Sequence, residues 1–283
     1  MTLTATILFA ICISPLVSAA AAPDRSLGIS PLRREVDITA GTTYASNVLI
    51  KNSGKNNLSI KLSAEVFSVT NESYDYSFNA TDDATQWVHF SPNSFDLQSG
   101  QSQIVNYSIS VPIGSESGGR YLSLFATSNP AQDKSGVDSV ERVASLVYIT
   151  IPGNISRIGN VLTLKSPAVI FSSGVWSASV QNKGTSHFRS VYSVTIKSLF
   201  GQTMKSNETS ALILPSSVRL ISGDVPMPKW IGLYKVTYSI GLGDKPADVE
   251  TRWVLYAPTA QLIVVCCIAG AFVLLVVTRR NKR

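Results

Sequence analysis

The sequence predicts an all-β protein: two tandem immunoglobulin-like antiparallel β-sandwiches, followed by one C-terminal transmembrane helix. Three observations lead to this prediction. An apolar segment lies at each end of the chain, apolar and polar side chains alternate between the ends, and 283 residues allow two domains of about 150 residues. Hydrophobic residues make up 45% of the chain and charged residues 15%, which excludes a disordered polypeptide.

The amino-terminal segment has the pattern of a secretory signal peptide. Residues 1–22 contain no Lys, Arg, Asp or Glu, and the apolar run Ile7–Leu16 precedes a group of small residues. Cleavage near Ala19 or Ala21 fits this pattern. We therefore expect residues 1–22 to be removed and the body of the chain to be exported.

The body of the chain alternates with a period of two, as strands with one buried face do. The pattern is clearest in residues 58–66, 105–111, 192–197 and 235–240. No segment of the body shows a sustained helical stripe. Sheets with one apolar face bury it against a second sheet, which predicts sandwiches.

A boundary between two sandwiches is indicated at Pro152-Gly153-Asn154, directly after the apolar run Val147–Ile151. We expect one sandwich within residues 23–152 and another within 153–258, each near the ~100 residues of an immunoglobulin-like domain. Residues 129–138, rich in small and polar side chains, are predicted to form a long loop inside the first sandwich.

The carboxyl-terminal segment predicts a membrane helix over residues 259–278. Thr259–Val277 hold no charged residue, and a helix of that length spans about 28 Å, close to one hydrocarbon core. The two cysteines within it, Cys266 and Cys267, either pack in lipid or carry acyl groups. The tail, 279–283, contains the basic cluster Arg279, Arg280, Lys282 and Arg283. By the positive-inside rule this tail is a cytoplasmic anchor, which predicts a single-pass cell-membrane protein with its body outside.

The charge and the cysteine content of the exported body bear on nucleic-acid binding and on disulfide bonds. The tail carries four of the 24 basic residues, so residues 23–258 hold 20 basic and 18 acidic residues, and the net charge of +6 does not indicate a nucleic-acid partner. All three cysteines lie in the predicted signal and membrane segments, so no disulfide is expected in the body.

No catalytic, metal-binding or cofactor-binding motif is visible. His89 and His187 have no second ligand at zinc spacing, and we expect His89 to face solvent and His187 to make structural hydrogen bonds. No nucleophile elbow or phosphate-binding glycine loop occurs, so we predict no enzyme activity and no cofactor.

Two acidic groups offer oxygen ligands for calcium in principle, but neither matches a known calcium-loop pattern, and solvated loop charges are the simpler interpretation. They are Asp82-Asp83 and the set Asp133, Asp138 and Glu141.

Aromatic residues provide the candidate binding site. Residues 71–79 interleave rings with Ser and Asn, the composition of adaptable recognition loops. We therefore predict partner binding by Tyr74, Tyr76 and Phe78, through loop contacts or strand addition to a sheet edge. The alternative is a hairpin tip whose rings fold back on the sheet. The four tryptophans are predicted to fill the cores: Trp87, Trp176, Trp230 and Trp253.

Short motifs follow one another along almost the whole chain. In the first half they are Ile29-Ser30-Pro31, Ala40-Gly41, Ile50-Lys51-Asn52, Val69-Thr70-Asn71 with Tyr76, Val111-Pro112 and Gly118-Gly119-Arg120-Tyr121. In the second half they are Asn182-x-Gly184-x-x-His187, Leu199-Phe200-Gly201, Leu214-Pro215 with Arg219, and Gly232-x-Tyr234. In this order they resemble the WxL-interacting proteins, surface proteins of Gram-positive and related bacteria.

The resemblance implies a non-enzymatic surface protein whose first sandwich is associated with peptidoglycan and whose second binds a surface protein bearing a WxL domain. We therefore predict a membrane-anchored extracellular binding or scaffold protein that engages cell-wall polysaccharide or peptidoglycan, or another surface protein. The alternative is a structural or sensory subunit of a larger membrane complex, assembled through the helix around Cys266–Gly270. Pilus chaperones share such sandwiches but work free in the periplasm, and the membrane span argues against that role.

Overall fold

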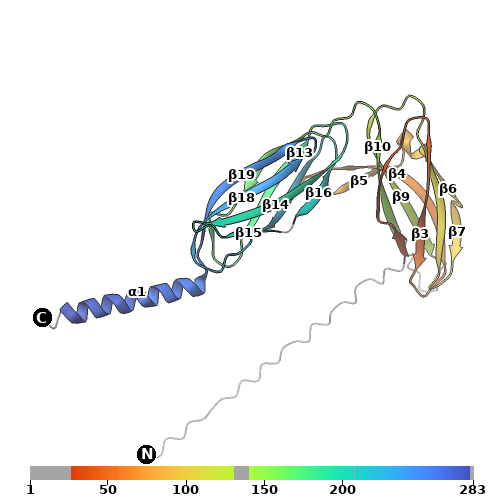
Figure 1. The fold of residues 1–283 in the computed structure, drawn as a ribbon. Helices are drawn as coiled ribbons and strands as arrows, with labels where there is room; N and C mark the ends of the chain where they lie inside the picture. Colours follow the sequence, from red (N-terminus) through yellow and green to blue (C-terminus); the bar gives the residue numbers. More distant parts are fainter. Residues whose placement is uncertain (1–26, 131–139, 207, 281–283) are drawn as a thin grey trace, which may run out of the picture.

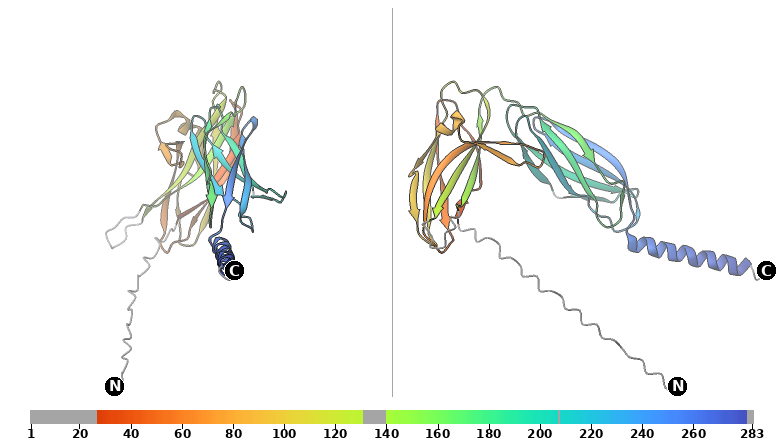
Figure 2. Two further views of the ribbon diagram at one scale, coloured as in Figure 1. Left: turned by 90° about the vertical axis from the view of Figure 1, so that its left-hand side faces the viewer. Right: turned by 180° about the vertical axis from the view of Figure 1, so that it is seen from behind.

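The structure, a computed structural model, describes residues 27–130, 140–206 and 208–280. Two β-sandwiches follow each other along the chain, and a single long helix leaves the far end of the second one (Figure 1). Figure 2 shows the same arrangement from the side and from behind. The predicted signal peptide and the tail residues Lys282 and Arg283 lie outside the described residues.

The first sandwich has two facing sheets. One contains, in spatial order, β1 (Leu27–Ser30), β3 (Thr43–Asn52), β8 (Ser102–Ser110) and β6 (Val88–Ser91). The other contains β2 (Arg33–Asp37), β10 (Arg142–Ile151), β9 (Gly118–Pro130), β4 (Leu58–Val69) and β5 (Tyr76–Asn79), with β7 (Ser94–Leu97) also paired to β4. A 3₁₀-helix, η1 (Asp83–Trp87), connects β5 to β6.

The second sandwich repeats this plan. Its smaller sheet has the order β11 (Gly159–Lys165), β13 (Val175–Asn182) and β17 (Val218–Asp224). Its larger sheet has the order β12 (Val169–Ile170), β19 (Lys245–Tyr256), β18 (Gly232–Leu242), β14 (Phe188–Ser198) and β15 (Thr203–Lys205), with β16 (Thr209–Ile213) also paired to β14.

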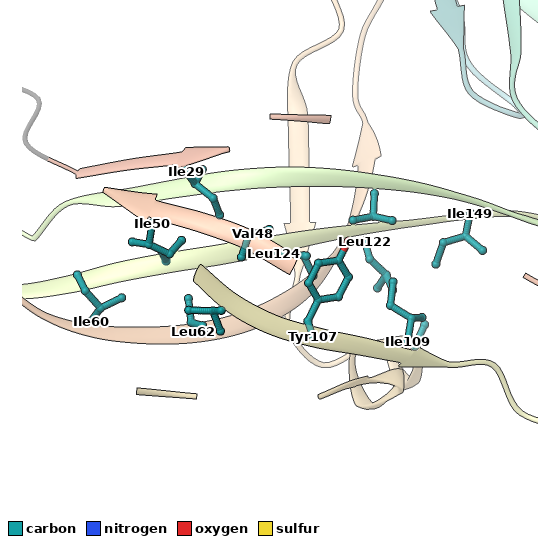
Figure 3. Close-up of a cluster of buried hydrophobic side chains, with 14 of the residues drawn as sticks. Ile29, Val48, Ile50, Ile60, Leu62, Tyr107, Ile109, Leu122, Leu124 and Ile149 are labelled. Carbon is teal, nitrogen blue, oxygen red and sulfur yellow. The ribbon is translucent and has the colours of Figure 1, made fainter. Parts of the chain in front are cut away.

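The predicted fold class of two immunoglobulin-like sandwiches is confirmed, and the period-two alternation marks the core faces. In β4, Leu58, Ile60 and Leu62 are buried while Ser59 and Lys61 are exposed. Figure 3 shows side chains from facing sheets meeting in the core of the first sandwich. The core of the second is built in the same way around Trp176, which is 2% exposed. Alternating strands thus bury one face each, as expected for paired sheets.

Two features of the sheets were not predicted. Each sandwich contains one parallel strand pair, β2 with β10 and β12 with β19, because the opening segment of each sandwich changes from one sheet to the other. The predicted loop at residues 129–138 is wrong at its start, since Asn129 and Pro130 pair with β4 at the end of β9; residues 131–138 lie outside the described residues. Strand pairing of this kind depends on distant partners, which alternation does not encode.

One turn is built identically in both sandwiches around a fully buried asparagine. Asn52 ends β3 and donates from Nδ2 to the carbonyls of Asn56 and Leu97, at 2.8 and 3.1 Å. Asn182 ends β13 and donates from Nδ2 to the carbonyls of Ser186 and Ile213, at 3.0 and 2.9 Å.

The side-chain oxygen of each asparagine accepts the backbone N–H of the glycine two residues later, Gly54 or Gly184. Each asparagine therefore satisfies three backbone groups, and around Asn182 all three hydrogen bonds are buried, so these groups would otherwise lie buried without partners.

The helix α1 (Thr259–Arg280) follows β19 after two residues. It is long and apolar enough to cross a membrane, with a mean hydropathy of 2.8, and none of its residues is buried against the sandwiches. Arg279 and Arg280 lie in its last turn.

We expect the substitution Asn182→Ala to lower the free energy of unfolding of the second sandwich by about 2–4 kcal/mol, because it leaves buried backbone groups without hydrogen bonds. Urea unfolding of the full chain in detergent, followed by Trp fluorescence, measures this change. Asn160→Ala, at an exposed position of the neighbouring strand β11, is the matched control. Equal stability of the two variants would contradict the role of Asn182.

Candidate functional site

The hairpin formed by β4 and β5 extends from the first sandwich to the second. Figure 1 shows β5 reaching toward β16, and its turn, residues 70–75, lies against the second sandwich. Within the turn, Thr70 and Asn71 bond to Asp75, and Tyr74 adopts a left-handed backbone conformation with φ of 70°. The turn of this hairpin is therefore held in one shape by its own hydrogen bonds. We call residues 70–75 the clamp turn.

Tyr74 is the central side chain of the clamp turn. Its ring is buried among Leu212 and Leu214 of the second sandwich, and the guanidinium of Arg219 lies 4.2 Å from the ring centre. Its hydroxyl accepts the backbone N–H of Leu214 at 2.6 Å and lies 3.1 Å from the hydroxyl of Ser217. Burial raises the pKa of Tyr74 above its usual value, so the phenol stays protonated at neutral pH.

Glu72 of the clamp turn adds two further contacts. Its backbone carbonyl accepts the N–H of Leu220 at 2.9 Å, and its carboxylate accepts the hydroxyl of Ser179 at 2.7 Å. Leu220 and Ser179 are paired residues on neighbouring strands β17 and β13. The turn therefore binds both the loop after β16 and the smaller sheet of the second sandwich.

The outer face of β4, β9 and β10 carries an aromatic cluster beside the clamp turn: Phe67, Tyr121 and Tyr148. Their ring centres are 5.3 to 5.8 Å apart. Phe67 and Tyr148 are 1% exposed although they point away from the core of their own sandwich. The second sandwich and the hairpin cover this face, which adds apolar burial to the junction.

His187 of the second sandwich meets this cluster. The hydroxyl of Tyr121 accepts the backbone N–H of His187 at 3.1 Å and lies 3.3 Å from its Nδ1. Beside it, the N–H of Gly119 donates to the carbonyl of Thr185 at 2.9 Å. Gly118 approaches the same carbonyl so closely that a Cβ would lie 2.9 Å from it. The expected structural role of His187 is therefore observed, at the junction between the two sandwiches.

A pocket of about 450 Å³ lies between the sandwiches next to His187. The first sandwich contributes Glu35, Val36, Asp37 and Thr150, and the second contributes Arg157, His187, Phe188, Arg189, Leu212, Gly243 and Asp244. The pocket thus contains three carboxylates and two guanidinium groups. We call it the charged cleft. A lining with both signs of charge suits a polar partner carrying groups of both signs.

One ion pair crosses the charged cleft, between Arg189 of the second sandwich and Glu35 of the first. Both side chains are about 40% exposed, so the pair contributes at most about 1 kcal/mol to the junction. The buried contacts of the clamp turn outweigh it. The charged groups of the cleft therefore remain available to a partner at little cost to the junction.

The three predicted partner-binding residues have different environments. The prediction that Tyr74 binds a partner is wrong, because its ring and its hydroxyl contact the second sandwich of the same chain. Tyr76 and Phe78 are each 39% exposed and pack edge-on against Phe67 and Phe125, with ring centres 5.5 and 5.0 Å apart. The alternative interpretation of rings folded back on the sheet therefore describes these two residues, although part of each ring still faces solvent.

The prediction that all four tryptophans fill the cores is wrong for two of them. Trp176 is buried, and Trp87 packs against the core of the first sandwich. Trp230 and Trp253 are 69% and 54% exposed. Trp253 faces outward because its neighbours on β19, Val254 and Tyr256, take the inward positions. Because apolar residues lie on both faces of that strand, its sequence pattern does not show which face is buried.

The other polar candidates take structural or exposed positions. His89 is exposed on β6, as predicted. Asp82 accepts the N–H of Ala84 at 2.9 Å and caps η1, and Glu141 accepts the N–H of Leu27 at 2.8 Å. Asp133 and Asp138 lie outside the described residues. Within residues 27–130, 140–206 and 208–280, no three His, Cys, Asp or Glu side chains gather as a metal site.

Sequence reasoning missed the aromatic cluster and the charged cleft. A signal for the cluster was present: in Val147–Ile151 every residue is apolar or Thr, and all five are buried. An unbroken run of this kind indicates a strand covered on both faces. The cleft had no such signal, because its charged residues come from segments more than a hundred positions apart.

We expect Tyr74→Phe to speed amide hydrogen exchange at Leu214 by about tenfold, because loss of a buried hydrogen bond costs about 1.5 kcal/mol. Exchange measured by NMR or mass spectrometry on the full chain in detergent tests this. Tyr44→Phe, in the first sandwich, is the control and leaves Leu214 unchanged. Unaltered exchange at Leu214 in Tyr74→Phe would show that the clamp turn does not protect this amide.

His187 predicts a pH dependence of stability. Burial lowers its pKa, with the carboxylates of Glu35 and Asp37 opposing this shift and Arg157 and Arg189 adding to it. Because the unfolded chain binds this proton more tightly, the stabilisation is complete above the unfolded pKa of about 6.5 and is lost as the pH falls through the lowered folded value.

The urea concentration at the unfolding midpoint should therefore decrease as the pH is lowered from about 7.5 to about 5, and His187→Gln should reduce this decrease. His89→Gln removes the exposed histidine and should leave the decrease unchanged. An identical decrease in both variants would exclude His187 as its source.

No family model matches the chain, and no curated protein matches it. Similar solved structures include the class 5 fimbriae chaperone CfaA, 12% identical, covering 82% of this chain and 100% of its own, with a TM-score of 0.42. A chain of the CsuC–CsuE chaperone–tip adhesion subunit pre-assembly complex of Acinetobacter baumannii is 12% identical, covering 83% of this chain and 99% of its own, with a TM-score of 0.41. The ASH/PapD-like domain 7 of human CEP192 is 21% identical, covering 50% of this chain and 97% of its own, with a TM-score of 0.36.

Proposed function

We propose that this chain is a membrane-anchored binding protein whose two sandwiches hold a partner outside the cell. In this proposal α1 is a single membrane span, and the basic residues that begin with Arg279 and Arg280 stay in the cytoplasm. The length of α1, its hydropathy and the exposure of all its residues support the anchor. The role needs no catalytic step.

The observation that carries the proposal is the junction between the sandwiches. The clamp turn and the aromatic cluster join the two sandwiches through buried contacts, while the charged cleft and the rings of Tyr76 and Phe78 stay open beside them. A binding surface held by buried contacts loses less conformational freedom when a partner docks. The arrangement therefore favours recognition by preformed surfaces of both sandwiches together.

We further propose that the chain belongs with the WxL-interacting proteins. Four of the segments that resemble this family, around residues 69–76, 118–121, 182–187 and 214–219, meet at the junction in the structure. They supply the clamp turn, its receiving residues and the contact between Tyr121 and His187. The resemblance therefore covers the residues that join the two sandwiches as well as the turns inside each one.

The partner class follows from the exposed chemistry. The charged cleft beside β2 offers three carboxylates and two guanidinium groups, and β5, at the opposite edge of the same sheet, offers two half-exposed rings. This combination suits a protein segment with polar and apolar side chains, so we propose another surface protein as the partner of the junction. Peptidoglycan or cell-wall polysaccharide is the second proposed partner, from the family resemblance of the first sandwich.

The test is retention of partners by the full chain in detergent, immobilised through its carboxyl terminus and offered solubilised surface proteins or cell-wall fragments. We expect the wild type to retain a surface protein. The double variant Tyr76→Ser, Phe78→Ser should weaken retention by about tenfold, because exposed rings at an interface contribute more than 1 kcal/mol. Ile113→Ser removes an exposed apolar side chain elsewhere on the first sandwich and is the control.

Three outcomes discriminate the hypotheses. Retention that depends on Tyr76 and Phe78 supports the junction as a binding surface. Retention of neither surface proteins nor cell-wall fragments would reject the binding role. Co-purification of a membrane complex with a variant lacking both sandwiches would instead favour the structural or sensory subunit, assembled through α1.

A further inference from the structure

The end of the second sandwich from which α1 leaves carries large exposed apolar side chains. In the loop between β14 and β15, Leu199 and Phe200 are 66% and 96% exposed, and before β18, Trp230 is 69% exposed. These residues line one pocket of about 380 Å³ together with Leu233, so the two segments lie side by side.

The apolar surface continues onto the outer face of the larger sheet. Leu233 of β18 pairs with Leu255 of β19, and Trp253 lies two residues before Leu255 on the same outward face. All three side chains are between 41% and 54% exposed. We call the whole set the apolar rim: Leu199, Phe200, Trp230, Leu233, Trp253 and Leu255.

The first turn of α1 is bonded to the residues on either side of Trp230. The side-chain oxygen of Gln261 accepts the N–H of Ile231 at 2.7 Å, and its Nε2 donates to the carbonyl of Lys229 at 2.7 Å. At the end of β19, the N–H of Ala257 donates to the carbonyl of Ile170 at 2.8 Å. The chain therefore passes from sheet to helix without a free linker. Gln261 lies about 3 Å along the axis from the start of α1, so the rim sits at the level where α1 begins.

The charges around the rim fit a phospholipid surface. Lys197, Lys229 and Lys235 are exposed on the same strands and loop. No Asp or Glu lines the pockets that these segments form among the described residues. Tryptophan and other amphipathic rings favour the boundary between water and lipid, and lysines near it attract lipid phosphates.

We propose that the apolar rim is a bilayer-docking surface that inserts among phospholipid headgroups around the entry point of α1. This inference rests on the proposed membrane anchor and deepens it, because it assigns a second contact between the protein and the lipid. A contiguous exposed apolar surface needs a partner, and the bilayer that receives α1 is the nearest one. Docking at the rim sets the tilt of the second sandwich, and through the clamp turn that of the first.

The experiment uses the full chain in vesicles of phosphatidylcholine and phosphatidylglycerol that contain phosphatidylcholine spin-labelled at the headgroup. The spin label quenches the fluorescence of a tryptophan at that depth. Because Trp230 and Trp253 are the two tryptophans of the rim, we expect Trp230→Ser and Trp253→Ser each to remove about half of the quenching. Trp87→Phe, which alters a tryptophan in the first sandwich, should remove none. Circular dichroism of each variant checks that the strands remain folded.

Flotation of the same vesicles separates failure of the anchor from failure of the rim. If the chain floats but neither rim variant changes the quenching, the docking surface is rejected while the membrane anchor stands. If the chain does not float, both proposals are rejected. If Trp87→Phe removes as much quenching as the rim variants do, the label quenches tryptophans in both sandwiches, and docking by the rim is also rejected.

Discussion

The contact on which the arrangement of this protein depends is the insertion of Tyr74 into the second sandwich. A tyrosine at this turn makes two contacts at once. Its ring fills an apolar site beside Leu212 and Leu214, and its hydroxyl accepts the backbone N–H of Leu214, which would otherwise lack a partner. Either change alone, a lost ring or an unpaired N–H, costs more than a surface ion pair contributes. The relative position of the sandwiches is thus set by a buried polar contact, and the exposed pair of Arg189 and Glu35 adds little to it.

The asparagine turn of the second sandwich explains how this sandwich can present such a junction. Asn182 holds the loop between β13 and β14 in place, and that loop carries Thr185 and His187, which meet Gly119 and Tyr121 of the first sandwich. The core of one domain and the contact between domains are therefore connected by one buried side chain. A change at Asn182 acts on the stability of the second sandwich and on the shape of the surface that it offers to the first.

How far the sequence predicts this molecule depends on whether a signal is local. Alternation in β4 or β18 identifies the core face from neighbouring residues alone, so the sandwiches were predictable. The composition of residues 71–79 predicts partner binding, but composition does not state which surface is bound, and Tyr74 contacts a surface of the same chain instead of a partner. The prediction that Trp253 fills the core was wrong for a related reason. A large apolar side chain is buried only when another part of the protein covers it, and the strand of Trp253 has apolar residues on both faces. The charged cleft requires the relative position of two domains, which no single segment carries.

The two ends of the second sandwich present opposite chemistry, and this has a consequence for any partner. At the end that meets the first sandwich, the open surface is the charged cleft, whereas the end that meets α1 carries the apolar rim. Because the clamp turn binds the first end and Gln261 binds α1 to the second, neither end can turn independently of its neighbour. The position of the charged cleft relative to α1 is therefore determined by a series of short contacts, which are buried at Tyr74 and exposed at Gln261. In the membrane-anchored protein that we propose, a binding surface connected in this way would face a direction that the protein itself sets, which is the physical requirement for displaying a site at a fixed height and angle above a lipid surface.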